Sequence, residues 1–347
     1  MAISKKLKTI KATAPIRICD NGGWTDTWFA EYGTVFNIAV SPLVHVEIAC
    51  FPRSEKPCPV TIIAQNYGDE YGPKLDGASW EKHPLIEATL VHSGIPNDVA
   101  IELHIFSEAP AGASTGTSAA LTIALLAGLA ELNGQSLDGY ALASAAHHVE
   151  TVLLKQQSGI QDQLCAAFGG INLIEMAAYP HATVTQLHLS ETVTQELEDR
   201  LLLIYLGQPH SSSAIHEKVI RELEDLGRTA KQLAPLRETA VQAATALQNG
   251  DFQALGQSMI ANHEAQRGLN TALISPEADQ IAAMAQQYGA LGWKVNGAGG
   301  NGGSITLLGN QNPEQKQQLI QAIEAADPNF KNLSIRLQTK GVTVQTD

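Results

Sequence analysis

A loop of small residues that runs directly into an apolar helix places the strongest constraint on this chain. Residues 107–121 read SEAPAGASTGTSAAL, and the segment SAALTIALLAGLAELNG that continues from it is apolar on nearly every side. A helix of that kind is buried on most of its surface, so we expect it inside a large core, ending at Asn133 and Gly134. At 347 residues the chain has room for two domains, or for one large domain with an appendage.

β-rich segments dominate the first hundred residues, and helices dominate much of the rest. We predict strands at TIKATAPIRI, GTVFNIAV, VHVEIACF, VTIIAQNY and AIELHIFS, and one helix at HPLIEATLVHSG. Further along we expect a strand pair at GGINLIEM and LLLIYLG and three amphipathic helices from about 211 to 267. Two strands around a glycine loop, a helix, and short strands at LSIRLQT and GVTVQT follow. This order predicts an α+β protein, which we divide into domains of residues 1–195 and 196–347.

The composition limits the classes of binding partner and the cellular compartment that we expect for this chain. The formal net charge of −13 argues against a nucleic-acid surface, because that affinity depends on Lys and Arg. No window has the run of about 18 apolar residues that spans a bilayer, and the N-terminus lacks the apolar segment of a signal peptide. We therefore expect a cytoplasmic protein with no membrane partner and no structural disulfide. Both a monomer and a homodimer remain open.

The loop before the apolar helix is a candidate phosphate cradle. Free N–H groups at a helix N-terminus attract anions, and small side chains let a phosphate approach the backbone. No Lys follows Gly116, so the loop is not a Walker A motif, and Ser114 or Thr115 serving only as a helix cap is the alternative. The candidate nucleotide-binding residues are Pro110, Gly112, Ala113, Ser114, Thr115, Gly116, Thr117 and Ser118.

A second glycine loop, NGAGGNGG, spans residues 296–303. Gly297, Gly299 and Gly302 satisfy GxGxxG, but a strand follows instead of the helix that a dinucleotide site requires. The companion motifs of protein kinases are absent from the sequence. The glycines are therefore predicted to let the backbone of this loop closely approach a ligand or another segment of the chain.

Carboxylates in the segment HHVETVLLKQQSGIQDQLCAAF supply candidate catalytic groups. Glu150 lies beside an apolar helical stripe of Leu142, Ala145, Val149 and Val152, and Asp162 stands between two glutamines. Mg²⁺ prefers few carboxylates together with phosphate oxygens and waters, so Glu150 and Ser118 are candidate ligands. Phosphoryl transfer also needs a group at the acceptor hydroxyl and a cation, for which Asp162 and Arg17 are the candidates. Asp162 acting only as a helix cap remains the alternative.

These motifs, in this order, resemble the GHMP kinase superfamily. The resemblance rests on APIRICDNGGWTDTWFAEYGTVFNIAV at 14–40, PAGASTGTSAA at 110–120, KVNGAGGNGG at 294–303 and GIQDQLCAAFGGIN at 159–172. GGWTDT, QDQ and HPLIEATL are most similar to the branch of D-glycero-D-manno-heptose 7-phosphate kinases and L-fucokinases. The resemblance implies an N-terminal domain like domain 2 of ribosomal protein S5, a ferredoxin-like C-terminal domain, and an active site between them.

The resemblance also implies an activity and a role for each motif. The expected reaction is ATP- and Mg²⁺-dependent phosphorylation of a sugar or sugar phosphate, at the anomeric C1 hydroxyl. Residues 112–118 would hold the ATP phosphates, Ser118 and Glu150 the Mg²⁺, and Asp162 and Arg17 would act at the reacting groups. The expected acceptor-binding residues are Asp20, Gly22, Gly23, Trp24, Asp26, His210, Gly297, Gly299 and Gly300.

Two departures from the family pattern keep alternatives open. The usual second motif is close to GLGSS, whereas this chain has STGTS at residues 114–118, and His210 stands where that branch leads us to expect Arg. A sugar- or nucleotide-binding regulator without activity is one alternative, and a galactokinase-like kinase of another sugar is a second. Trp24 could face a sugar ring or pack against the other domain, and Asp20 could contact sugar or form a turn.

Overall fold

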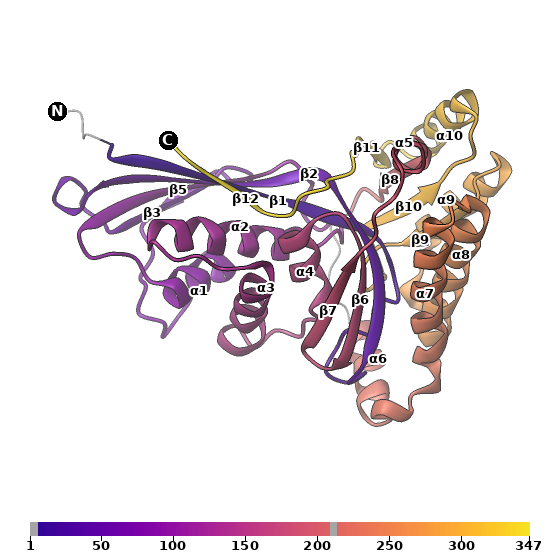
Figure 1. Cartoon of the computed structure of the whole chain (residues 1–347), viewed down its shortest axis with the longest axis horizontal. Helices are drawn as coiled ribbons and strands as arrows, with labels where there is room; N and C mark the ends of the chain where they lie inside the picture. The colour runs from indigo at the N-terminus through magenta and orange to yellow at the C-terminus, as the bar shows by residue number, and fades with distance from the viewer. Residues whose placement is uncertain (1–5, 209–213) are drawn as a thin grey trace.

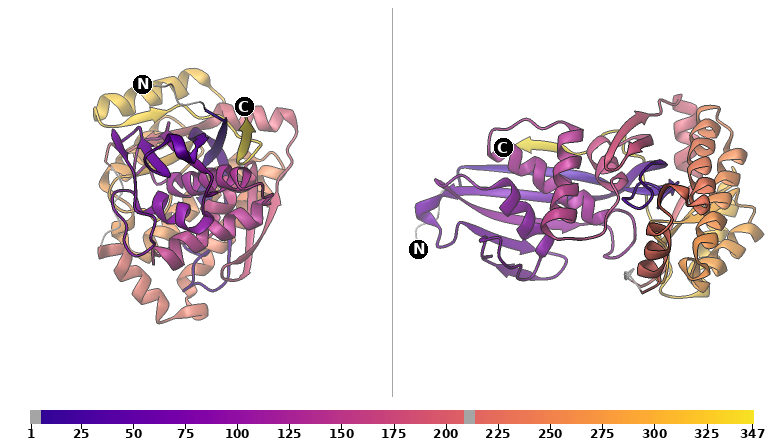
Figure 2. Two further views of the ribbon diagram at one scale, coloured as in Figure 1. Left: turned by 90° about the vertical axis from the view of Figure 1, so that its left-hand side faces the viewer. Right: turned by 90° about the horizontal axis from the view of Figure 1, so that it is seen from below.

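An eight-stranded sheet and a four-stranded sheet organise the molecule into two lobes (Figures 1 and 2). The computed structural model describes residues 6–208 and 214–347. The strands are β1 (Lys8–Asn21), β2 (Gly33–Pro52), β3 (Val60–Ala64), β4 (Asp69–Tyr71), β5 (Val99–Ser107), β6 (Ile171–Ala178), β7 (His181–Gln186), β8 (Leu201–Tyr205), β9 (Gly292–Val295), β10 (Ser304–Leu308), β11 (Lys331–Leu333) and β12 (Thr343–Thr346). The α-helices are α1 (Pro84–Ser93), α2 (Thr117–Leu132), α3 (Gly139–His148), α4 (Gln161–Phe168), α5 (Glu191–Arg200), α6 (Ala214–Glu224), α7 (Ala234–Gln248), α8 (Phe252–Leu269), α9 (Pro276–Gln287) and α10 (Pro313–Ala326). Short helical turns are η1 (Arg53–Glu55), η2 (Val149–Leu153), η3 (Gly227–Thr229), η4 (Lys231–Leu233) and η5 (Thr271–Leu273).

The larger sheet has the order β12-β1-β2-β5-β3-β4, and β6 and β7 extend it from β2. The smaller sheet has the order β11-β8-β10-β9. The predicted α+β class is confirmed by this mixture of sheets and helices. β12 comes from the end of the chain yet pairs with β1, so the C-terminus returns to the first lobe (Figure 1). The proposed division between residues 195 and 196 stays a prediction.

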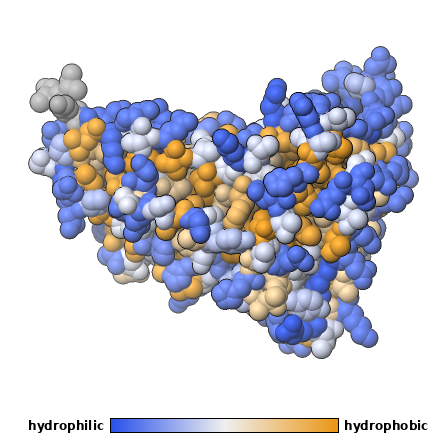
Figure 3. All heavy atoms as spheres, in the orientation of Figure 1, coloured by the Kyte–Doolittle hydropathy of each residue, from blue (hydrophilic) through white to orange (hydrophobic). Residues whose placement is uncertain are grey.

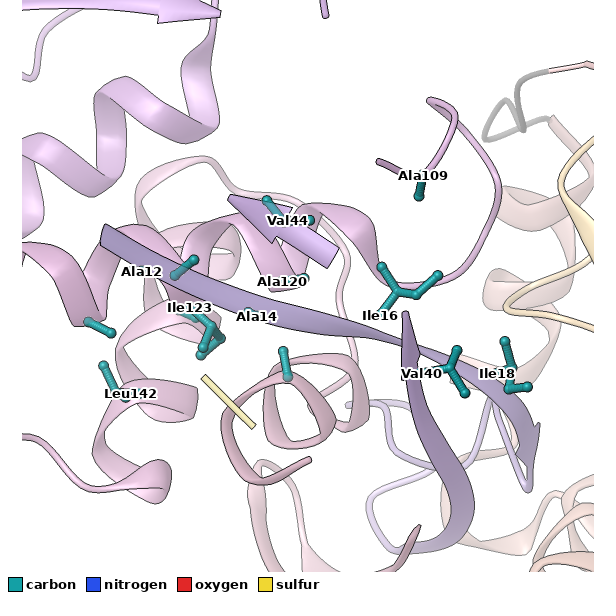
Figure 4. Close-up of a cluster of buried hydrophobic side chains, with 14 of the residues drawn as sticks. Ala12, Ala14, Ile16, Ile18, Val40, Val44, Ala109, Ala120, Ile123 and Leu142 are labelled. Atoms are coloured by element: carbon teal, nitrogen blue, oxygen red, sulfur yellow. The ribbon is translucent and has the colours of Figure 1, made fainter. Parts of the chain in front are cut away.

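The apolar helix lies where the sequence predicts, at the centre of the main core. Every residue of α2 from Thr122 to Ala130 is buried, and its side chains Ala120 and Ile123 pack with Ala12 and Ala14 of β1 (Figure 4). Because α2 is held against the sheet along its length, the loop at its N-terminus has a fixed origin.

Several local predictions need correction. GTVFNIAV and VHVEIACF form the single strand β2, and GGINLIEM and LLLIYLG do not pair, since β6 belongs to the first sheet and β8 to the second. Val152 is 55% exposed because the helix widens into the π-turn η2, which breaks the 3.6-residue period of the predicted stripe. Only β11 and an isolated bridge between Val40 and Leu337 represent the strand expected at LSIRLQT.

The surface is mostly polar at the edge of the second lobe. Hydrophilic side chains cover the rim formed by α9 and α10 (Figure 3). Among the described residues, no helix has both the length and the hydropathy needed to cross a membrane.

Helix α8 and strand β9 approach each other at two glycines. A Cβ on Gly256 would lie 2.2 Å from the carbonyl oxygen of Leu291, and one on Gly292 would lie 2.4 Å from the Cα of Gly256. The smaller sheet therefore packs against α8 backbone to backbone.

We predict that Gly256→Ala lowers the free energy of unfolding by about 2–4 kcal/mol, because backbone atoms must move to admit the methyl group. Gly268→Ala is the matched control in the same helix, since its Cβ would meet nothing within 4 Å. The control should be neutral or stabilising by up to about 1 kcal/mol. Urea unfolding measures both, and equal effects of the two substitutions would contradict the packing described here.

Candidate active site

Arg17 of β1 and Asp162 of α4 form the centre of the site. Arg17 Nε lies 2.8 Å from Asp162 Oδ1, and Arg17 Nη2 lies 3.2 Å from Asp162 Oδ2. Burial lowers the pKa of Arg17, but the Asp162 and Asp20 carboxylates outweigh it and leave that pKa above its ordinary value. The arrangement is a two-bond ion pair whose Asp162 side chain remains partly open to solvent.

The small-residue loop wraps around this ion pair. Arg17 donates its backbone N–H to Thr115 O at 2.9 Å and its Nη1–H to Ser114 O. Gly116 has a φ of 71°, and a Cβ there would lie 3.2 Å from Asp162 Oδ2, so glycine allows both the turn and the close approach. Ser114 also has a positive φ, of 58°, and its buried Oγ has no hydrogen-bond partner.

The loop forms one side of a cavity of about 530 Å³. Residues 111–118 line it, so every predicted nucleotide-binding residue except Pro110 faces this space. The lining also includes Asn66, Tyr67, His83, Leu85 and Ile86, none of which was predicted from the sequence as a site residue. HPLIEATL, which contains His83, Leu85 and Ile86, is the one motif that pointed to this part of the cavity, whereas Asn66 and Tyr67 had no such signal.

A second cavity, of about 550 Å³, lies beside the first. It is lined by Asp20, Gly23, Trp24 and Asp26 of the predicted acceptor segment, together with Ser158 and residues of α6. Both cavities share Arg17, Asp162, Gly297 and Ala298. The two spaces therefore meet at the Arg17–Asp162 ion pair.

Asp20 is held inside the protein by both of its oxygens. Lys294 Nζ of β9 donates to Asp20 Oδ1 at 2.7 Å, and the Gly297 N–H donates to Asp20 Oδ2 at 3.0 Å. Both charged side chains are at most 1% exposed. Arg17 Nη2 is 3.9 Å from Asp20 Oδ2, so this buried pair joins β1, the second glycine loop and the central Arg17.

A polar network beside this pair joins β1 and the second glycine loop to the small-residue loop before α2. Asn296 Oδ1 accepts the Cys19 N–H at 3.1 Å and the Thr306 Oγ1–H at 2.8 Å. Ser304 Oγ accepts from Asn296 Nδ2 at 3.0 Å and donates to Ala113 O at 2.6 Å. β1, the second glycine loop with β10, and the small-residue loop before α2 are thus linked through buried side chains.

Asp26 caps the helix that carries Asp162. Its Oδ2 accepts the N–H groups of Ile160 and Gln161, each at 3.0 Å. Burial raises the pKa of Asp26 to about 6. Asp26 therefore faces the second cavity while one of its oxygens fixes the start of α4.

Trp24 packs against the second lobe and also lines the second cavity. Its ring stacks on His216 of α6, with centroids 5.9 Å apart, and His216 Nε2 lies 3.0 Å from Gly299 O. Burial lowers the pKa of His216. No sequence pattern marked His216, whereas the predicted His210 lies outside the described residues.

The other predicted glycines shape the backbone instead of lining a cavity. The Gly22 N–H donates to Asn262 Oδ1 at 2.7 Å, and the Gly300 N–H donates to Leu273 O at 2.6 Å. A Cβ on Gly299 would lie 2.2 Å from Leu273 O. Of the glycines predicted to bind the acceptor, Gly23 and Gly297 line the second cavity.

Glu150 has one carboxylate oxygen without a protein partner, although its side chain lines neither cavity. Its Oε2 accepts from Ser158 Oγ at 2.6 Å and from Gln163 Nε2 at 2.9 Å, while Oε1 is buried without a partner. Burial raises the pKa of Glu150 to about 7. Glu150 lies in the π-turn η2, a type of turn that is frequent at functional sites. The orphaned oxygen fits a cation ligand.

Ser118 lines the first cavity and is exposed. Within residues 6–208 and 214–347, no hydrogen bond joins Ser118 to Glu150, and no group of three or more His, Cys, Asp or Glu side chains could hold a metal. A cation here would need oxygen atoms from outside the protein, as Mg²⁺ bound with a nucleotide has.

Both halves of the chain match one family. "GHMP kinases N terminal domain" matches residues 84–170, and "GHMP kinases C terminal" matches residues 243–329. The chain belongs to the GHMP kinases. The predicted fold is confirmed with it, and so is the prediction of a phosphotransferase.

Individual GHMP kinases resemble the chain at low identity. The D-glycero-alpha-D-manno-heptose 7-phosphate kinase of Campylobacter jejuni is 25% identical, over 91% of this chain and 94% of its own. The bifunctional fucokinase/GDP-fucose pyrophosphorylase of Arabidopsis thaliana is 24% identical over 90% of this chain, which spans 31% of that protein. A D-glycero-D-manno-heptose 1-phosphate kinase structure from Bacteroides thetaiotaomicron superposes with a TM-score of 0.72 at 19% identity, covering 97% of this chain and 98% of its own.

We predict that Lys294→Met destabilises the protein more than the double substitution Asp20→Asn with Lys294→Met. The single change leaves a buried carboxylate without its cation, which costs about 3–5 kcal/mol. The double substitution removes both charges, so its free energy of unfolding should be at least about 1 kcal/mol higher than that of Lys294→Met. Denaturant unfolding of the four variants of the cycle measures the coupling. Strictly additive effects would show that the pair does not stabilise the contact between β1 and β9.

We also predict that Glu150 makes the protein without nucleotide or metal less stable as the pH rises. The pKa of Glu150 is about 7 when folded, against an ordinary value of 4.5. Between these values the folded state keeps a proton that the unfolded state has released, so stability falls by about 3 kcal/mol from pH 4.5 to pH 7.

Glu150→Gln should remove this part of the pH dependence, measured by urea unfolding between pH 5 and pH 8. Glu222→Gln, at an exposed position of α6, is the control and should keep the slope of the unmodified protein. An unchanged slope in Glu150→Gln would show that Glu150 is ionised in the folded protein throughout this range.

Proposed function

We propose that the protein transfers the γ-phosphoryl group of ATP to a hydroxyl of a sugar or sugar phosphate, with the anomeric C1 hydroxyl as the acceptor. The observation that carries the proposal is the meeting of two cavities at Arg17, Asp162, Gly297 and Ala298. Phosphoryl transfer requires a donor and an acceptor to approach one another in line, with charge neutralisation at the junction.

In this proposal the first cavity holds ATP. Residues 112–118 present the backbone of a helix N-terminus, where N–H groups and the helix dipole favour phosphate. α2 is buried in the core, so the loop is held in place before the nucleotide arrives. The roles of Gly112, Ala113, Ser114, Thr115, Gly116, Thr117 and Ser118 rest on this placement, and Pro110 would act only through the shape of the loop.

Ser118 and Glu150 would hold Mg²⁺ together with the phosphate oxygens. The support is the buried Glu150 Oε1, which has no partner in the protein. When bound, the ion supplies neutralisation of the negative charge on the transferred group. Ser158 and Gln163 fix Glu150 through its other oxygen, so the free oxygen has a defined direction.

Asp162 is the proposed base or charge stabiliser at the acceptor hydroxyl. Its carboxylate lines both cavities, and Asp26 fixes the start of its helix. Arg17 is the only Lys or Arg that lines either cavity among the described residues. It would orient Asp162 and neutralise charge on the transferred phosphoryl group.

The experiment that tests this function measures ADP release from Mg-ATP with a panel of aldoses and their phosphate esters. We expect turnover with at least one acceptor, and we expect Asp162→Asn to lower its kcat by about 100-fold or more. Calorimetry should show that the variant still binds ATP.

Two results would count against the proposal. Absence of ADP release above the background with every acceptor would refute the proposed kinase activity. Binding of a sugar without turnover would favour the alternative of a sugar- or nucleotide-binding regulator without activity. Unchanged turnover in Asp162→Asn would leave the activity in place but remove Asp162 from the reaction.

A further inference from the structure

Aromatic side chains form one wall of the second cavity, hereafter the acceptor cavity. Trp24, Trp28 and Phe29 line it, and they come from one short loop after β1. Phe29 packs between the two tryptophans, with ring centroids 6.3 Å from Trp24 and 5.1 Å from Trp28. Flat apolar faces of this kind suit the C–H faces of a sugar ring, and the negative potential over each ring face disfavours an anion.

The charged groups of the acceptor cavity are mainly acidic. Four carboxylates line it, those of Asp20, Asp26, Asp162 and Glu217, whereas Arg17 is the only Lys or Arg among its described lining residues. Lys294 pairs with Asp20 outside the cavity lining, and Arg17 is already bonded to Asp162 at 2.8 and 3.2 Å. Glu217 pairs with Arg221 at 3.3 Å, but both side chains are exposed, so solvent screens that pair. The remaining charge is negative, which disfavours a second anion.

The helix N-terminus beside the acceptor cavity is already occupied by a carboxylate. The first N–H groups of α4 point to Asp26 Oδ2, at 3.0 Å from both Ile160 N and Gln161 N. Free N–H groups at such a position would be a ready site for a phosphate. Here the chain's own Asp26 takes that place, and a Cβ on Gly159 would lie 2.1 Å from the same oxygen.

From these observations we propose that the acceptor is an uncharged sugar and not a sugar phosphate. The proposal deepens the function proposed above and rests on it. Arg17 is then reserved for the phosphoryl group in transfer, and the aromatic wall and the carboxylates bind the ring and its hydroxyl groups. Carboxylates accept hydrogen bonds from hydroxyls, so the same groups that repel a phosphate ester favour a neutral polyol.

The test compares each sugar with its own phosphate ester. D-Mannose, D-galactose and D-glycero-D-manno-heptose are assayed beside mannose 6-phosphate, galactose 6-phosphate and heptose 7-phosphate, with Mg-ATP in all cases. For any pair that is turned over, kcat/KM should be at least about tenfold higher for the free sugar. Equal or preferred use of the ester overturns this inference and leaves the kinase function intact. No turnover of any acceptor overturns the function itself.

A charge reversal inside the cavity tests the physical cause. Glu217→Lys should lower the ratio of kcat/KM for the free sugar to kcat/KM for its phosphate ester by at least about fivefold, because it places a cation in the acceptor cavity. Glu222→Lys makes the same change on α6 at a position that does not line the cavity, and it should leave the preference unchanged. Equal effects of the two variants, or no effect of Glu217→Lys, would overturn the electrostatic explanation.

Discussion

The buried ion pair between Asp20 and Lys294 is the contact on which the arrangement of the site depends. It joins β1 of the larger sheet to β9 of the smaller one at 2.7 Å, in a region where an unpaired charge would be costly. Asp20 uses its other oxygen to hold the Gly297 N–H, which places the glycine loop over Arg17. Ser304 extends the connection to the loop before α2. Three segments that are far apart in the sequence are therefore held together by side-chain hydrogen bonds.

The four carboxylates of this region differ in how many of their oxygens bind protein donors. Asp20 has both oxygens occupied by protein donors, and Asp26 has one oxygen occupied by the start of α4. Asp162 and Glu150 differ from them, since Asp162 opens onto both cavities and Glu150 keeps one oxygen without a partner. From the sequence, Asp162 has a predicted catalytic role, Glu150 a metal-binding role, and Asp20 and Asp26 acceptor-binding roles, and these roles stay predictions. The structure adds that Asp20 and Asp26 also bind backbone N–H groups.

The sequence predicts best what depends on local pattern. The continuous apolar run of α2 and the glycines around it are local features, so the helix, its ends and the loop before it could be placed from the sequence. The pairing of Asp20 with Lys294 spans 274 positions, and no local pattern carries that information. A signal was nevertheless present, because Lys294 is a single cation in an apolar strand and such a residue needs a buried partner. The exposed Val152 was missed for another reason, since a π-turn shifts the period within one helix.

The balance of charge in the site explains why its parts must act together. Among the described residues, Arg17 is the only Lys or Arg in the lining of the two cavities, against Asp20, Asp26, Asp162 and Glu217, and Lys294 pairs with Asp20 from outside that lining. The protein alone therefore has little positive charge where the two cavities meet. Burial raises the pKa of Glu150 to about 7, and the nearby Asp162 carboxylate adds to that rise. A divalent ion carried in with a nucleotide would supply the missing charge and favour ionised Glu150 at the same time. In the function proposed above, nucleotide, ion and carboxylate would therefore bind interdependently, and this balance of charge would favour an acceptor that brings no further negative charge.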